Sequence, residues 1–317
     1  MQLLGVWCIS EWMSAGKPKS LQLVELGPGR GTLTDDLLRV FSNFGRLLNS
    51  CDISVHLVEV SPKLSDIQAQ RLTGKAIEVE LDKNSPVYKK GITKTGFPVC
   101  WYQDIQDVPT GFSFYIAHEF FDALPIHKLQ VCSQNSLIVI FSEMSPLFWL
   151  ILSCVLFDCD TNVTTNSFGL YKDDEPRDHV EVCPSAAVIM QKLANQIKSY
   201  GGAALIADYG HMGERTDTFR GFRAHKLHDV LSNPGTADLT ADVDFNFMRR
   251  IVGEAASCLG PVTQHEFLKN MGIDIRLKVL LEKSSDVAVQ KQLIHGYNIL
   301  MNADQMGQRF KFFSVVP

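Results

Sequence analysis

The sequence predicts an α/β fold built on a doubly wound, mostly parallel β-sheet. Two observations predict it: short apolar runs rich in β-branched residues alternate with segments of helical periodicity, and a glycine-rich turn joins the first run to the first helix. The chain has 317 residues, 45% of them hydrophobic, which is enough to bury a large core. Because no internal repeat or low-complexity linker divides it, we expect a single domain with decorations over residues 1–317.

The first half of the chain alternates expected strands with expected helices. The strands are short and apolar, whereas the helices carry apolar residues that recur with a helical period. Pro62 suits the first turn of the second helix. The expected strands are Leu21–Leu26, Ile53–Val60, Val99–Tyr102 and Phe112–His118, and the expected helices are Thr32–Phe44 and Pro62–Leu72.

The second half of the chain repeats the pattern. Ser185–Tyr200 is expected to be a helix that ends at Gly201-Gly202, since glycine commonly closes a helix. A buried strand is expected at Ala203–Ala207. Further along, Asp286–Leu300 is expected to be helical and Phe310–Val316 to be an edge strand.

Composition and charge argue against nucleic-acid partners and against a disulfide-bonded framework. The formal net charge is −5, so the chain has no overall electrostatic attraction to nucleic acid or anionic membranes. The eight cysteines are scattered and include no C-x-x-C pair. In a chain of this length, that pattern indicates reduced thiols in a reducing compartment.

The N-terminus reads as the inside of a longer domain. It has neither the basic residues of a signal peptide nor the Arg- and Ser-rich character of a transit peptide. The first residues instead read as a helix already under way. Its expected inward face is Trp7, Ile9, Trp12 and Met13. We therefore expect that part of the domain precedes Met1.

Leu137–Phe157 is far more apolar than its surroundings. It could be a membrane-spanning helix, a buried pair of strands, or sequence that is not native coding sequence. Glu143 and Pro146 interrupt it, and the remaining apolar run is too short to span a bilayer. We therefore expect no stable insertion into a membrane. Of the other two interpretations, the family resemblance described below favours the third.

The turn after the first strand, Gly27-Pro28-Gly29-Arg30-Gly31, carries the strongest functional signal. Its three glycines permit positive φ angles and let a ligand approach the backbone closely. The free amide groups at the start of the next helix favour anionic or polar ligand groups. Glycine turns also occur without ligands, so the motif alone is a weak signal. The candidate cofactor-binding residues here are Gly27, Pro28, Gly29 and Gly31.

Acidic residues follow the next two strands. Glu59 ends the second strand, where folds of this kind place a carboxylate for ribose hydroxyls. It lies further from the glycine turn than the roughly 20 residues usual in dinucleotide-binding folds. Asp104 follows the third strand and could accept a hydrogen bond from an adenine amino group. Either residue could instead be a solvated loop carboxylate.

NAD and S-adenosylmethionine both bind to this architecture, and three features favour S-adenosylmethionine. The glycines follow G-x-G-x-G rather than G-x-G-x-x-G spacing. An acid stands two residues before Gly27. The fourth strand ends in a polar cluster, His118-Glu119-Phe120-Phe121-Asp122, beside the expected position of the methyl group. An NAD-dependent oxidoreductase is the alternative.

The polar cluster after the fourth strand is the candidate catalytic group. Methyl transfer needs in-line approach of a nucleophile, so much of the catalysis is positioning. If the nucleophile is a guanidine, carboxylates suit it because they accept its planar N–H fork bidentately. We therefore expect Glu119 and Asp122 to hold a substrate arginine, with His118 as an acid, a base or a hydrogen-bond partner. In the alternative, Asp122 caps the following turn and His118 packs under the loop.

Two other polar groupings give weaker signals. His225 and His228 could bind a metal from one helical face, but ordinary polar contacts are favoured because no third ligand presents itself. We expect no metal. Asp238, Asp242 and Asp244 could line a groove for a basic substrate, although the capped start of a helix is favoured.

Several long motifs, in order, resemble those of the mitochondrial MidA-like protein-arginine methyltransferases, a family that includes an assembly factor of NADH dehydrogenase (complex I). The resemblance covers residues 3–130 and 175–316. The motifs are LQLVELGPGRGT at 21–32, VHLVEVS at 55–61, AHEFFDALPIH at 117–127, ADYGH at 207–211, DTFRG at 217–221 and GTADLTADVDF at 235–245.

The resemblance implies a Rossmann-like methyltransferase fold and symmetric dimethylation of an arginine on a complex I subunit. It also implies a mitochondrial matrix location and a role in complex I assembly. Residues 27–31 and Glu59 look like the cofactor site, and residues 118–122 like the substrate side. A non-catalytic assembly scaffold is the alternative.

The chain also departs from the family. Residues 131–172 replace a polar strand segment of the family and look like a retained intron or a mispredicted exon, and the family continues beyond both ends. We expect these departures to weaken cofactor binding and import into the matrix.

Overall fold

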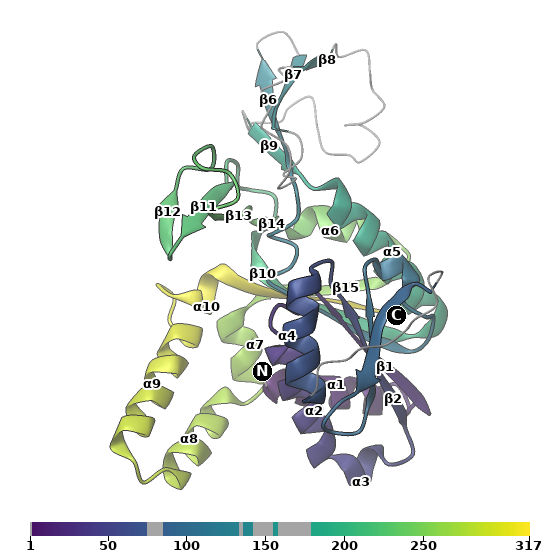
Figure 1. Ribbon diagram of the computed structural model, residues 1–317. Coiled ribbons are helices and arrows are strands. Elements are labelled where there is room, and N and C mark those ends of the chain that lie inside the picture. The colour runs from purple at the N-terminus through teal and green to yellow at the C-terminus, as the bar shows by residue number, and fades with distance from the viewer. Residues whose placement is uncertain (1, 75–84, 133–135, 142–154, 158–178) are drawn as a thin grey trace. The chain divides into compact units, whose positions relative to one another are not determined.

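The computed structural model describes residues 2–74, 85–132, 136–141, 155–157 and 179–317 (Figure 1). The chain divides into two compact units that alternate along the sequence. The first comprises Met1–Glu119, Lys192–Asp208 and Glu254–Pro317, and the second Phe120–Gln191 and Tyr209–Gly253. This division does not test the expectation of a single domain, which stays a prediction.

The first unit is built on a sheet with the strand order β15-β16-β10-β5-β1-β2-β4-β3. The strands β10, β5, β1, β2 and β4 run parallel to one another, whereas β3 is antiparallel to β4 and β15 to β16. This mostly parallel sheet with its helices confirms the predicted fold class. The strands are β1 Ser20–Leu26, β2 Asp52–Val58, β3 Val87–Ile92, β4 Pro98–Tyr102, β5 Ser113–His118, β10 Gly202–His211, β15 Ser257–Thr263 and β16 Phe310–Val316.

The parallel register places the functional loops at one edge of the sheet. Leu26 of β1 pairs with Val58 of β2 and with Ala117 of β5, and Val58 pairs with Tyr102 of β4. The residues that follow these positions therefore leave the sheet at its carboxyl edge, where ligands bind in this class of fold.

Helices follow the strands as predicted, because their apolar residues form one buried stripe. In α2 this stripe includes Leu33, Leu37 and Phe41. In α4, Ser61 caps the first turn and Gly74 closes the helix in the left-handed conformation. The helices of this part are α1 Gln2–Ser14, α2 Thr32–Asn43, α3 Gly45–Leu48, α4 Pro62–Thr73, the short 3-10 helix η1 Ile105–Asp107 and α5 Pro184–Tyr200.

The buried face of α1 agrees with the sequence prediction at three of its four positions. Trp7, Ile9 and Trp12 are buried, and the ring of Trp7 packs against Phe114 of β5 at 5.9 Å between centroids. Met13 is 45% exposed, so its predicted inward orientation is wrong. It follows Trp12 directly, and one residue turns a helix by about 100°, which points the two side chains in different directions.

The C-terminal part adds helices and the last two strands of the sheet. The helices are α7 Gln264–Asn270, α8 Ile273–Lys283, α9 Val287–Met301 and α10 Met306–Arg309. Of these, α8 and α9 form an antiparallel pair (Figure 1). The expected strand Phe310–Val316 exists as β16, but it lies between β15 and β10 and is not an edge strand. The outer strand β15 escaped prediction because Gly260-Pro261 interrupts its apolar run, and proline is tolerated there because the strand is at an edge.

The second unit contains small antiparallel sheets and one further helix. One sheet has the order β8-β7-β6-β9 and another the order β12-β11-β13. Val180, Val182, Ala187 and Phe247 form its apolar cluster. The elements are β6 His127–Cys132, β7 Ser136–Phe141, β8 Val155–Phe157, β9 His179–Val182, β11 Arg220–Arg223, β12 Lys226–His228, β13 Asp238–Thr240, β14 Val243–Asp244 and α6 Phe245–Val252.

Much of the apolar segment Leu137–Phe157 lies outside the described residues. Of its described parts, residues 136–141 and 155–157 are the antiparallel strands β7 and β8. Among the described residues, every helix is too short or too polar to cross a lipid bilayer.

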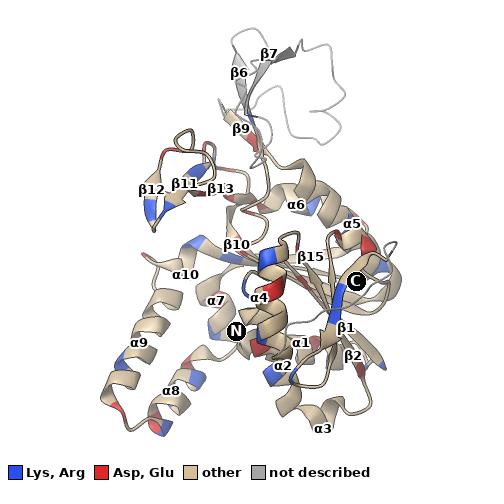
Figure 2. Ribbon diagram, in the orientation of Figure 1, with Lys and Arg blue, Asp and Glu red and all other residues tan. Residues whose placement is uncertain are grey.

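Basic and acidic residues are mixed on the helices: both signs occur on α4 and on α8 (Figure 2).

Candidate functional site

The turn after β1 has the backbone geometry that its glycines predict. Gly27, Gly29 and Gly31 have φ angles of 61°, 52° and 73°, a region that residues with a Cβ rarely adopt. The Gly27 amide donates to the carbonyl of Val58 at 3.0 Å, and the Gly31 amide to that of Pro28 at 2.8 Å. A Cβ placed on Gly29 would meet nothing within 4 Å, so the backbone there faces open space. The turn can therefore receive a ligand against its main chain.

Glu25 ties the strand before the turn to the helix after it. Its side chain is 3% exposed and accepts a hydrogen bond from the Thr34 hydroxyl of α2. Burial raises the pKa of the Glu25 carboxyl to about 7, although the hydrogen bond from Thr34 opposes the shift. The acid before Gly27, which the sequence singled out, thus holds the two arms of the turn together.

Glu59 lies at the end of β2 beside this turn, and its orientation is fixed. Its side chain is only 6% exposed. One carboxylate oxygen accepts the Ser61 amide at 2.8 Å, and the other accepts Nε2 of Gln68 at 2.9 Å. The Glu59 amide donates to the Tyr102 carbonyl at 2.9 Å, which extends the parallel pairing with β4. Each carboxylate oxygen has a second lone pair that a ligand hydroxyl can use.

Gln68 was not identified from the sequence. It lies on α4, is fully buried, and donates to the Gly29 carbonyl at 2.7 Å as well as to Glu59. Its position carried one signal: it stands four residues after Leu64 and four before Leu72, where helical periodicity calls for an apolar residue. A polar residue in an apolar stripe is most often bonded to something specific.

Asp104 follows β4 and takes part in a local hydrogen bond. Its side chain is exposed and accepts the Gln106 amide at 2.8 Å, which caps η1. The exposure agrees with the alternative of a solvated loop carboxylate, whereas the cap was not predicted. Its predicted contact with an adenine group stays a prediction.

His118 and Glu119 leave the sheet between β1 and β10. The ring of His118 packs against Phe310 at 5.4 Å, and burial lowers the pKa of this imidazole to about 4. His118 Nδ1 lies 3.9 Å from Glu119 Oε1, but the lowered pKa leaves the imidazole neutral at pH 7, so the two do not form an ion pair there. Glu119 has a φ of 50°, held by a 3.0 Å hydrogen bond from its amide to the Ala207 carbonyl. Its carboxylate is half-exposed in this strained position.

Asp122 belongs to the second unit. Its carboxylate accepts the Thr240 hydroxyl at 2.9 Å, and its carbonyl accepts the Ala241 amide at 3.0 Å. The residues that the sequence grouped as one catalytic cluster therefore fall into both units. The structure brings together His118 and Glu119, and their expected cooperation with Asp122 stays a prediction.

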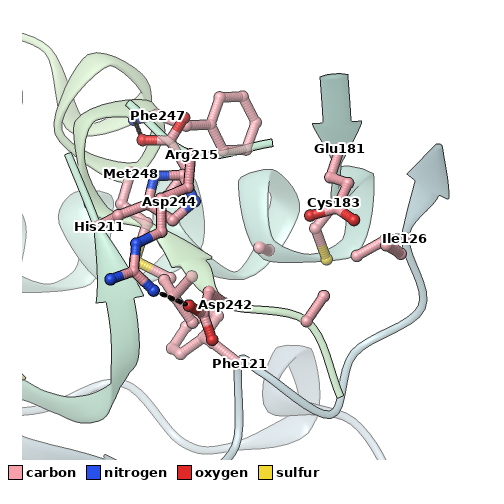
Figure 3. Close-up of a pocket in the computed structure, with 13 residues that line it drawn as sticks. Phe121, Ile126, Glu181, Cys183, His211, Arg215, Asp242, Asp244, Phe247 and Met248 are labelled. Carbon is pink, nitrogen blue, oxygen red and sulfur yellow. Dashed lines mark hydrogen bonds and ion pairs between the residues drawn. The ribbon is translucent and has the colours of Figure 1, made fainter. Parts of the chain in front are cut away.

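The second unit contains a pocket that is partly open to solvent (Figure 3). Asp242 on its wall accepts a hydrogen bond from Arg215 at 3.1 Å and pairs with Arg220 at 2.7 Å. Glu181 accepts the backbone amides of Thr218 and Phe219. Asp244 caps α6 through the Phe247 amide at 2.9 Å, as the favoured reading of this acidic stretch predicted. The carboxylates that line this pocket are thus engaged with arginines or with backbone amides.

The interpretation of His225 and His228 as lying on a helical face is wrong. His225 lies in the turn between β11 and β12, and His228 ends β12, because the chain forms a hairpin there. Within the described ranges, no three His, Cys, Asp or Glu side chains gather closely enough to bind a metal ion.

The residues at the carboxyl edge of β1 and β2 fit an S-adenosyl cofactor. The turn offers an open backbone at Gly29, and Glu59 offers an oriented, buried carboxylate. Gln68 joins them, since its Nε2 donates to both. Main-chain amides suit polar groups of a ligand, and a carboxylate suits a pair of ribose hydroxyls.

Comparisons with known proteins agree with this geometry. The sequence matches a family described as putative S-adenosyl-L-methionine-dependent methyltransferase over residues 3–262. It is 88% identical to the protein arginine methyltransferase NDUFAF7, mitochondrial, of Xenopus tropicalis, in an alignment that covers 100% of this chain and 73% of the relative. It is 57% identical to the human protein of that name, with coverage of 100% and 70%.

A solved structure shares the fold. A Burkholderia thailandensis protein bound to S-adenosyl-homocysteine superposes with a TM-score of 0.73 at 20% identity, covering 100% of this chain and 76% of the other.

Proposed function

The chain belongs to the family of S-adenosyl-L-methionine-dependent methyltransferases, and we propose that it transfers the methyl group to an arginine of a protein substrate. The family establishes the cofactor class and the reaction type. The arginine substrate is supported by the names of the relatives, which are arginine methyltransferases. In the structure, the observation that carries the cofactor site is the linked pair of the Gly29 backbone and Glu59 at the carboxyl edge of the sheet.

In this proposal the first unit holds the cofactor. The backbone of the turn at Gly29 contacts its polar groups, and the Glu59 carboxylate accepts hydrogen bonds from its ribose hydroxyls. The cofactor supplies an electrophilic methyl group on a sulfonium. Asp104 is proposed to contact the adenine from the neighbouring strand end.

Glu119 is proposed as the catalytic carboxylate. A guanidinium is protonated in water and presents a planar fork of N–H donors. Glu119, half-exposed beyond β5, can accept two of these bonds, localise charge on one nitrogen and accept the proton that the attacking nitrogen releases. Asp122 is proposed to share this grip on the substrate.

His118 is proposed as a hydrogen-bond partner rather than as the base. Burial lowers the pKa of its imidazole to about 4, so the ring is neutral at pH 7 and a weak proton acceptor. A neutral imidazole beside Glu119 adds no positive charge that would repel a guanidinium.

The finer assignment follows the family resemblance. We propose symmetric dimethylation of an arginine on a complex I subunit, in the mitochondrial matrix, during complex I assembly. The names of the relatives, which are mitochondrial proteins, support a mitochondrial location.

The cofactor is tested by calorimetric titration of the purified chain with S-adenosylmethionine, S-adenosylhomocysteine and NAD. Saturable binding of the first two and none of NAD is expected. Binding of NAD alone would reject the proposal in favour of an oxidoreductase. Tight binding of S-adenosylmethionine would also refute the expectation that the chain's departures from the family weaken cofactor binding.

The substrate is tested with radiolabelled methyl transfer to complex I subunits and to arginine peptides. Glu119→Gln should lower the rate by about a hundredfold or more, because the neutral amide cannot localise the guanidinium charge. The dissociation constant of S-adenosylhomocysteine should stay within about twofold. Glu282→Gln, an exposed position on α8, is the matched control and should behave as the wild type. A Glu119→Gln variant that methylates normally would remove Glu119 from the mechanism. Substrate binding without any transfer by the wild type would favour the scaffold alternative.

A further inference from the structure

Gln68 uses every part of its amide group although it is fully buried. Nε2 donates to the Gly29 carbonyl at 2.7 Å and to Glu59 Oε2 at 2.9 Å. Oε1 accepts from Nε1 of Trp101 at 2.9 Å. One side chain on α4 thus reaches the loop after β1, the acid after β2 and a buried residue of β4.

The chemistry of its partners allows only one orientation of this amide. An indole N–H can only donate, so it must face Oε1. The Gly29 carbonyl and the Glu59 carboxylate can only accept, so both must face Nε2. A flipped amide would oppose donor to donor and acceptor to acceptor at all three contacts. Trp101, itself fully buried, therefore fixes the direction in which Gln68 donates.

The helix and the loop also pack directly. A Cβ on Gly31 would lie 3.4 Å from Cγ of Gln68, which means that the loop backbone rests on this side chain. The Ser61 amide holds the other oxygen of Glu59 from the first turn of the same helix. Contacts with α4 thus fix the distance between the Gly29 backbone and the Glu59 carboxylate before a ligand binds.

We infer that Gln68 is a positioning residue for the cofactor: it sets the distance and angle between the glycine turn and Glu59 that an S-adenosyl group has to match. This inference rests on the proposed role of these two elements in holding the cofactor. Outer hydrogen-bond partners of this kind typically contribute about ten- to a hundredfold in affinity at metal sites. We expect a similar scale here because two donated bonds, one of them to a charged group, are lost together.

The test compares Gln68→Met with Gln70→Met. Methionine keeps the length and flexibility of glutamine but donates nothing. Gln70 lies on the same helix and is exposed, so it controls for the same chemical change. Dissociation constants of S-adenosylhomocysteine are measured by calorimetry at a temperature well below the unfolding midpoint of each variant, with circular dichroism confirming the fold.

Gln68→Met should raise the dissociation constant about tenfold or more, and Gln70→Met should leave it within twofold. A purely structural role would lower the unfolding temperature of Gln68→Met without changing its affinity, and that result would overturn the inference. If Gln68→Met does not fold, Gln68→Glu decides. It keeps the acceptor for Trp101 but opposes a second carboxylate to Glu59, and unchanged affinity would equally overturn the inference.

The same titrations separate this inference from the proposed function. Failure of the wild type to bind S-adenosylhomocysteine would count against the cofactor site itself. Weak binding by Glu59→Gln together with normal binding by Gln68→Met would keep the proposed site and reject only the positioning role.

Discussion

Replacing Glu25 by glutamine should make the protein more stable at alkaline pH. Burial raises the pKa of this carboxyl from 4.5 to about 7, so the folded state binds its proton more tightly than the unfolded state does. The stability that this proton preference provides is fully present below pH 4.5 and is lost as the pH rises through 7. Glutamine is neutral at every pH and its carbonyl can still accept the Thr34 hydroxyl.

The size of the effect follows from the shift. The pKa rises by roughly 2.5 units, and each unit corresponds to about 1.4 kcal/mol. The free energy of unfolding of Glu25→Gln minus that of the wild type should therefore be about 3 kcal/mol larger at pH 8 than at pH 4.5. The free energy of unfolding is measured by urea titration at several pH values. Because the low pKa of His56 and of His118 acts equally in both proteins, the difference between wild type and Glu25→Gln isolates Glu25. Glu282→Gln, at an exposed site, is the control. A difference that does not change between pH 5 and pH 8 would refute the reasoning.

Two further predictions concern the backbone and the second unit. Gly29→Ala should lower the free energy of unfolding by only about 1 kcal/mol, because the left-handed backbone is strained by a side chain but the surroundings of Gly29 are open. The same variant should weaken S-adenosylhomocysteine binding. Gly202→Ala should unfold the protein, because the new Cβ would lie 2.0 Å from the Ser113 carbonyl oxygen. Thermal melts with and without the ligand distinguish the two. Asp244→Ala removes the cap of α6 and should therefore lower the stability of the second unit by about 1 kcal/mol. Hydrogen exchange of the α6 amides measures this loss, and Asp238→Ala, at an exposed position, is the control. Equal protection of α6 in both variants would contradict the capping role.

Local sequence patterns predicted those strands and helices whose apolar pattern runs unbroken from one end of the element to the other. The apolar run at Leu21–Leu26 and the stripe of Thr32–Phe44 became β1 and α2 nearly residue for residue. β15 was missed because a proline and a glycine break its pattern. The position of β16 within the sheet was mistaken, because sequence periodicity describes one strand and not its neighbours.

The sequence by itself determined the fold class, the glycine turn and the acid at the end of β2, because φ preferences and strand ends are local properties of the chain. Only the tertiary structure decided which side chains support them. Gln68 lies 39 residues from Gly29 and 33 from Trp101 along the chain, and no local preference relates positions so far apart. The same holds for the burial that raises the pKa of Glu25 and lowers that of His118. Proton affinity and hydrogen-bond partners depend on what surrounds a group in space, and that exists only once the sheet and helices have packed.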